Sequence, residues 1–185
     1  MVEAAGRIIN ESGISYLSIE ELAGEMKIDQ SLLNPYFVHN DEILMLLLLS
    51  MGDEIKRLIN ETRAGNWLPD EELRILFENI HQLLEIKPYY LSVIFSTQLK
   101  EKNASLQNTL INIKISVREY VLEVIDRGKK DMVFKNRMPS RSLGNYILKS
   151  FRSFMHEQRQ FARMAKDMER LKAIEDSDFQ LNIIK

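Results

Sequence analysis

The residues with the clearest binding chemistry are polar side chains between Ser18 and Asn40. Amide side chains such as Gln30 and Asn34 can pair with adenine in the major groove of DNA. Hydroxyl groups and a lysine could contact phosphates, which position a protein on a duplex without reading its sequence. These residues could equally do no more than cap and cover short helices. We take the following as candidate DNA contacts: Ser18, Lys27, Gln30, Ser31, Asn34, Tyr36 and Asn40.

Residue types that support catalysis are sparse in this chain. Its 185 residues include no cysteine, which excludes disulfides, thiolate catalysis and Cys-based zinc sites. The histidines at 39, 81 and 156 lie far apart in sequence, without the spacing of a metal site or a catalytic triad. There is no glycine-rich phosphate loop. We therefore expect no enzyme activity, no cofactor and no metal.

The candidate DNA contacts fall on a predicted pair of short helices joined by a tight turn. Ser18 and Glu21 have the S-x-x-E spacing of a capping box, so a helix is predicted to begin there. Asp29 is a second cap candidate and opens a predicted second helix. Two short helices with this separation form a helix-turn-helix unit, whose second helix can enter the major groove.

The rest of the chain predicts an all-α fold with no convincing strand. Apolar residues at helical spacing predict helices at about 2–12, 40–63, 69–85, a short stretch after 88, 104–127, one opening at 140, and 158–175. The stretch 128–139 is basic and is predicted to be a loop. We place an N-terminal three-helix helix-turn-helix domain at 1–45, joined by a long helix to a helical body at 46–185.

The helical body contains two further groups of candidate residues. Aromatic side chains with a few polar tips are suited to a ligand pocket, although each could be plain core: Phe77, His81, Leu84, Tyr90, Phe95, Val117, Tyr120 and Tyr146. Apolar seams on the last two predicted helices could form a four-helix bundle with a second copy, or pack within a monomer: Ile147, Phe151, Phe154, Phe161, Met164, Met168 and Leu171.

Charge is unevenly distributed along the chain. Residues 1–66 hold five Lys or Arg and eleven Asp or Glu, a net charge of −6, whereas the remainder has a net charge of +4. Because DNA affinity normally depends on basic side chains that neutralise phosphates, an acidic helix-turn-helix is unfavourable for DNA binding. The longest apolar run, 43–49, is far shorter than a membrane span, and no secretory signal is evident. We expect a cytoplasmic protein.

Residues 4–47 resemble the N-terminal domain of tetracycline-repressor-like (TetR/AcrR) transcriptional regulators. The positions that carry the resemblance are Gly13, Ser18-Ile19, Leu22-Ala23, Ile28, Leu33, Phe37 and Asp41-Glu42-Ile43-Leu44. The resemblance implies a ligand-responsive regulator, repressing in most cases, that binds double-stranded operator DNA as a homodimer. It also implies that the helical body binds a small hydrophobic effector and carries the dimer interface.

The sequence departs from the family pattern at positions expected to contact DNA. The family usually has glycine at Lys27, a small hydroxyl residue at Leu32, tyrosine at Asn34 and lysine at Asn40. Pro35 removes a backbone donor late in the predicted second helix and disfavours helical geometry at Asn34. An alternative is therefore a TetR-like protein whose acidic head binds a protein partner and not DNA.

Overall fold

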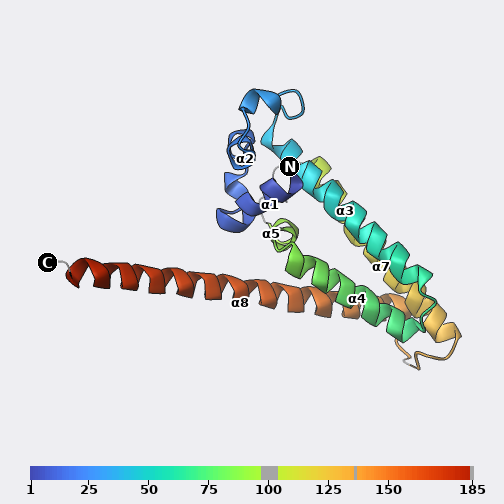
Figure 1. Cartoon of the computed structure of the whole chain (residues 1–185). Helices are drawn as coiled ribbons and strands as arrows, with labels where there is room; N and C mark the ends of the chain where they lie inside the picture. The colour runs from blue at the N-terminus through green and yellow to red at the C-terminus, as the bar shows by residue number, and fades with distance from the viewer. Residues whose placement is uncertain (97–103, 136, 184–185) are drawn as a thin grey trace. The chain divides into compact units, whose positions relative to one another are not determined.

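The computed structural model describes residues 1–96, 104–135 and 137–183, with side chains through Phe161 and at Met164. All regular elements within these ranges are helical, which confirms the all-α prediction (Figure 1). They are α1 (Val2–Glu11), η1 (Ile14–Tyr16), α2 (Ile19–Met26), η2 (Gln30–Leu32), α3 (Asn40–Ala64), α4 (Pro69–Ile86), α5 (Tyr89–Ile94), α7 (Ala104–Lys130) and α8 (Ser140–Ile183). None of these helices is both long and apolar enough to cross a membrane.

Most helix boundaries follow from local signals in the sequence. The Oγ of Ser18 accepts a hydrogen bond from the Glu21 N–H at 3.1 Å, so α2 begins at the predicted cap. Pro69 is the first residue of α4, where its missing N–H costs nothing. Both helices therefore begin where the predicted signals lie.

The second helix of the predicted helix-turn-helix is shorter than expected. Gln30 to Leu32 form a single 3-10 turn, and Leu33 to Tyr36 continue as turns. Pro35 has no N–H to donate, and its ring disfavours helical geometry at Asn34. A helix begins at the predicted cap, Asp29, whose side chain accepts from the Ser31 N–H, but it is therefore one 3-10 turn and not the longer helix that the sequence analysis expected.

Two further expectations about the C-terminal half need correction, the first by only three residues. The basic stretch predicted as a loop from residue 128 is partly helical, since α7 continues to Lys130. The two predicted late helices are one helix, α8, of 44 residues. No proline or glycine lies between residues 145 and 183, so nothing local interrupts it.

The described chain divides after Leu148 into two units, Met1–Leu148 and Lys149–Lys185. The first unit holds every helix up to the first turns of α8, and the second is the remainder of α8. The predicted boundary at residue 45 falls within α3 and stays a prediction.

The core of the first unit is formed mainly by α3, α4 and α7. Helices α3 and α7 lie side by side and run in the same direction (Figure 1). Thr109 contacts Met45 near the start of both helices, and Arg63 pairs with Glu123 at 2.8 Å toward their ends. From residue 45 to residue 63 an α-helix rises about 27 Å. This pair of helices therefore connects the N-terminal helices to the far end of the body.

Candidate nucleic-acid interface and ligand cavity

The helix-turn-helix segment is held by a few buried apolar anchors. Leu22 and Ala23 on α2 are 0% and 3% exposed, and Leu33 and Phe37 are 3% and 7% exposed. Burial of such side chains contributes roughly 1.5–3 kcal/mol each for the larger ones. The anchors fix the orientation of the turn around η2, so the side chains between them face solvent.

Five of the seven predicted DNA contacts share this exposed surface, which we call the head surface. Tyr36 is 72% exposed, and Leu32 in the same segment is 59% exposed. Exposed polar side chains at these positions could reach a nucleic acid without rearrangement. The residues of the head surface are Lys27, Gln30, Ser31, Asn34 and Tyr36.

The other two predicted contacts, Ser18 and Asn40, cap the start of α2. The Oδ1 of Asn40 accepts a hydrogen bond from the Ile19 N–H at 3.1 Å, next to the Ser18 bond to Glu21. Asn40 is the first residue of α3, so this bond ties the start of α3 to the start of α2. The structure thus gives both residues the capping role that the sequence analysis offered as an alternative to DNA contact.

Lys27 has an unusual backbone conformation. It ends α2 with φ 55° and ψ 43°, the left-handed region, while the Ile28 N–H donates to the Ala23 carbonyl at 3.1 Å. A residue with a side chain is disfavoured there by about 1–2 kcal/mol relative to right-handed geometry. The helix cap therefore holds the one lysine of this segment at some cost in stability.

Acidic groups near the head surface are held in their charged form. Hydrogen bonds from Ser31 lower the pKa of Asp29, whose Oδ1 accepts from the Ser31 N–H at 2.8 Å. The backbone N–H groups of Val38 and His39 likewise lower the pKa of Glu42. Arg7 is paired with Glu25 at 2.5 Å. Residues 1–45 contain one other basic side chain, Lys27. Among the contacts that the structure describes, Lys27 has no acidic partner within hydrogen-bonding distance.

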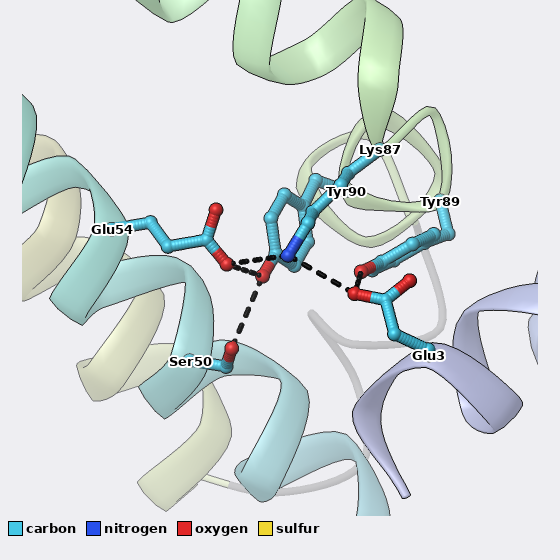
Figure 2. Close-up of polar contacts among 6 residues, drawn as sticks. All are labelled: Glu3, Ser50, Glu54, Lys87, Tyr89 and Tyr90. Carbon is cyan, nitrogen blue, oxygen red and sulfur yellow. Dashed lines mark hydrogen bonds and ion pairs between the residues drawn. The ribbon is translucent and has the colours of Figure 1, made fainter.

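A group of polar side chains joins α1 to the body, and we call it the Lys87 cluster (Figure 2). The Lys87 ammonium donates to Glu54 Oε1 at 2.8 Å and lies 3.1 Å from Glu3 Oε1. Tyr90 donates to the same Glu54 oxygen at 2.9 Å, and Tyr89 donates to Glu3 at 3.3 Å. The cluster therefore links the first helix of the chain to α3 and to the start of α5.

Electrostatics and packing both stabilise this junction. Partial burial lowers the pKa of Lys87, but its bonds to Glu54 and Glu3 outweigh burial and raise that pKa to about 12. A Cβ added at Gly6 would stand 2.4 Å from Cε1 of Tyr89, so α1 packs on the tyrosine ring through its glycine. The signal for this cluster in the sequence was the Lys-Pro-Tyr-Tyr run, 87–90, which the sequence analysis used as a helix start and, at Tyr90, as part of the predicted ligand pocket.

The residues predicted to form a ligand pocket do not share one environment. Leu84, Tyr90 and Tyr120 are buried, whereas Tyr146 is 65% exposed. Tyr120 donates to Glu72 at 2.5 Å, and Tyr90 belongs to the Lys87 cluster. The remaining four residues are partly buried, and the set stays a prediction: Phe77, His81, Phe95 and Val117.

A cavity of about 260 Å³ lies elsewhere in the first unit, where α4, the α7–α8 segment and the start of α8 meet. Of the predicted residues it includes only Ile147, which was assigned to the dimer seam. The sequence analysis missed the others because they come from three helices and the segment between α7 and α8, and share no spacing. We call this the α4–α7–α8 cavity, and its lining is Leu73, Ile125, Val133, Phe134, Lys135, Leu143 and Ile147.

The remaining seam residues lie on α8 in the second unit. Phe154, Phe161 and Met164 are 44%, 67% and 60% exposed, and Phe151 is partly buried. The side chains of Met168 and Leu171 lie outside the described part of the chain. The dimer interface stays a prediction.

Among the described residues, no group of His, Asp or Glu side chains is arranged to hold a metal ion. The polar side chains of the head surface are hydrogen-bond donors and acceptors. Their arrangement can bind a polar surface and orient it.

Comparison with known proteins supports the resemblance at the level of structure. No family model and no curated protein matches the sequence. A TetR-family regulator, PfmR, from Thermus thermophilus has a TM-score of 0.72 at 18% identity, with 84% of this chain and 82% of that chain covered. The fatty acid degradation regulator FadR from Bacillus halodurans has a TM-score of 0.69 at 17% identity, covering 86% and 85%.

A third solved structure contains a ligand. The transcriptional regulator FadR from Bacillus subtilis, in complex with stearoyl-CoA, has a TM-score of 0.68 at 18% identity, covering 83% of this chain and 82% of that one. All three similarities cover between 83% and 86% of this chain. The chain therefore has the fold of the TetR/AcrR-family transcriptional regulators.

Proposed function

We propose that this chain is a ligand-responsive transcriptional regulator, most simply a repressor, that binds operator DNA as a homodimer through the head surface. The observation that carries the proposal is the division of roles around η2. Leu33 and Phe37 are buried as anchors, while Gln30, Ser31 and Asn34 around them are exposed. Amide side chains in such positions can read base edges, and Tyr36 and Lys27 can contact phosphates.

A homodimer would compensate for the small number of cations on each head. Two heads that contact half-sites about 34–36 Å apart double the phosphate and base contacts without any new residue. The exposed apolar side chains of α8, Phe154, Phe161 and Met164, are the surface that we propose for dimerisation. Size measurement of the purified chain tests this part separately.

The Lys87 cluster offers a route by which an effector in the body could change the position of the heads (Figure 2). It ties α1 to α3 and to the start of α5 through charged hydrogen bonds. A small hydrophobic effector that shifts these elements would change the separation of two heads in a dimer. Such an effector would then lower DNA affinity by favouring one of two arrangements.

The decisive experiment compares two double variants in a mobility-shift assay on the chain's own upstream DNA at low salt. Gln30→Ala with Asn34→Ala should weaken binding by at least tenfold, because a paired amide–adenine contact contributes about 1–3 kcal/mol. Gln82→Ala with Asn60→Ala changes the same residue types at exposed positions of α4 and α3 outside the head surface and should leave binding unchanged.

Two results would contradict the proposal. The first is a folded, dimeric wild-type chain that neither shifts nor protects this DNA at low salt. The second is equal binding by the two double variants. A steep loss of affinity with rising salt would identify phosphate contacts, whereas a protein captured without DNA enrichment would identify the head as a protein-binding surface.

A further inference from the structure

The α4–α7–α8 cavity has walls that are fixed by polar contacts around it. Glu72, next to Leu73, is 3% exposed and accepts from Tyr120 at 2.5 Å and from Arg127. These bonds hold the first turns of α4 against the end of α7. Because charged hydrogen bonds in a buried setting stabilise one geometry, this wall exists before any ligand binds.

The segment after α7 closes the cavity in an equally defined way. The N–H groups of Val133 and Phe134 both donate to the Gly128 carbonyl, at 2.8 and 3.0 Å. A Cβ at Gly128 would lie 2.4 Å from the Phe134 ring, so the ring packs directly on the helix backbone. The two apolar side chains are thus folded back over the end of α7, where they line the cavity.

The size and lining of the cavity restrict what it can hold. Its volume of about 260 Å³ lies just below the usual range for ligand pockets, about 300–1,000 Å³. An apolar cavity of about 150 Å³ is enough for benzene, so this one suits an apolar body of roughly six to ten carbon atoms. Six of the seven lining residues are apolar, and Lys135 is the only charged one.

The segment that closes the cavity is basic, whereas the first turn of α4 beside Leu73 is acidic, with Asp70 and Glu71 exposed. Residues 127–141 contain six basic side chains and one acidic side chain, Asp131. Arg127 and Lys129 are engaged within the protein, by Glu72 and by the Met138 carbonyl. Concentrated charge of one sign raises the local concentration of oppositely charged ligands. The other members of this group are Lys130, Lys135, Arg137 and Arg141.

We propose that the α4–α7–α8 cavity binds a medium-chain carboxylate, with its apolar chain against Leu73, Ile125 and Phe134 and its carboxylate against Lys135. Binding itself follows from the cavity and its charge. Its effect on DNA rests on the proposed function, since the cavity lies at the end of α3 and α7 away from the head surface. A displacement there would reach the head along these two helices.

Isothermal titration calorimetry of the full chain without DNA tests the proposal, with octanoate, 1-octanol and octylammonium as matched probes. Octanoate should bind more tightly than 1-octanol by about threefold or more and more tightly than octylammonium by at least tenfold. Lys135→Glu should remove this preference and weaken octanoate binding about tenfold. Lys56→Glu makes the same charge change at an exposed position on α3 and should leave octanoate binding unchanged.

A second variant tests the apolar half of the site. Ile147→Trp places a larger side chain in the cavity and should abolish binding of both octanoate and 1-octanol. Thermal unfolding followed by circular dichroism establishes whether Ile147→Trp is folded, and Leu143→Phe serves in its place if it is not. Equal affinity for the anion and the cation, or octanoate binding that survives the filled cavity, would overturn the proposal.

The two proposals can fail independently. Octanoate binding without any DNA shift leaves the cavity proposal intact and removes the regulator proposal. A DNA shift that depends on Gln30 and Asn34, with no octanoate binding, would support the regulator proposal and overturn the cavity proposal. If octanoate binds and DNA is shifted, octanoate should weaken the shift for the wild-type chain and not for Lys135→Glu.

Discussion

The head surface and the α4–α7–α8 cavity distribute charge in opposite ways. Residues 1–45 contain two basic side chains, Arg7 and Lys27, against eight acidic ones, and Glu25 pairs with Arg7. Residues 127–141 contain six basic side chains against one acidic one. The surface proposed to bind a polyanion thus has little positive charge, whereas the proposed small-molecule site has an excess.

This difference separates two ways of recognising an anion. On the head surface, binding must come from directed hydrogen bonds and from the second head of a dimer, since long-range attraction is weak. At the cavity, one lysine and its basic surroundings can attract a carboxylate before an apolar chain is buried. DNA binding by the head of one monomer should therefore be selective but weak. Binding at the cavity should depend on the charge of the ligand and on the size of its apolar part.

The largest effect is expected when the buried carboxylate beside the cavity is removed. Glu72→Ala leaves Arg127 and Tyr120 without their acceptor and should destabilise the first unit by about 2–3 kcal/mol, a value that allows for the partial exposure of Arg127. Octanoate binding should be lost as well. Urea unfolding measures the first effect and calorimetry the second.

Glu71→Ala provides the matched control, because Glu71 is an exposed carboxylate in the same first turn of α4. It should change the free energy of unfolding by less than about 0.5 kcal/mol. If both variants unfold at the same urea concentration as the wild type, the Glu72 contacts do not hold the cavity wall.

A second variant acts on the junction between the two regions. Lys87→Met should destabilise the protein by about 1–2 kcal/mol at pH 7, since Glu54 loses a charged hydrogen bond in a partly buried site. The folded pKa of Lys87, about 12, lies above its ordinary value of 10.5. Its contribution is therefore complete below about pH 10.5 and is lost as the pH rises through 12.

Urea unfolding of the wild type and Lys87→Met between about pH 7 and pH 12 measures this contribution as a difference. The gap between the two proteins should shrink by about 1 kcal/mol at the highest pH, after allowance for solvent screening. Lys56→Met, at an exposed lysine 3.9 Å from Asp53, should show almost no gap at any pH. If the difference in free energy of unfolding between the wild type and Lys87→Met stayed constant with pH, the ion pairs of Lys87 would not be the cause of its stabilising effect.

The smallest expected effect concerns the head surface. Lys27→Gly restores the residue type that tolerates a left-handed backbone, and should stabilise the protein by about 0.5 kcal/mol net of the greater freedom of unfolded glycine. The same change removes a cation, so the slope of the logarithm of DNA affinity against the logarithm of salt concentration should become less steep by about one for each head. Thermal unfolding and mobility shifts at several salt concentrations measure the two effects.

Much of the fold was accessible from the sequence because its signals are local. Ser18 and Pro69 mark helix starts, and buried residues such as Leu33 and Phe37 lie where the resemblance requires them. Pro35 was recognised as unfavourable for a helix, but the reduction of that helix to one 3-10 turn depends on how the neighbouring chain packs. Local signals therefore identified the elements and left their lengths open.

The sites depended on contacts between distant residues, which sequence spacing does not reveal. Asn40 caps a helix that begins 21 residues earlier, and Lys87 meets Glu3 across the chain. Ile147 was assigned to a seam from its helical spacing, which gives a face of the helix but not the partner of that face. The cavity lining comes from three helices and the segment between α7 and α8, so no pattern along the sequence could identify it.

At Gly6 the backbone of the first helix packs directly against the body of the protein. Where every other residue type carries a Cβ, the ring of Tyr89 occupies the space, 2.4 Å from the ideal position of that atom. One additional methyl group would act as a wedge that pushes α1 away from α5 without any ligand. The position of α1 therefore depends on the absence of a Cβ at residue 6. A shift of the Tyr89 ring would move the first helix directly.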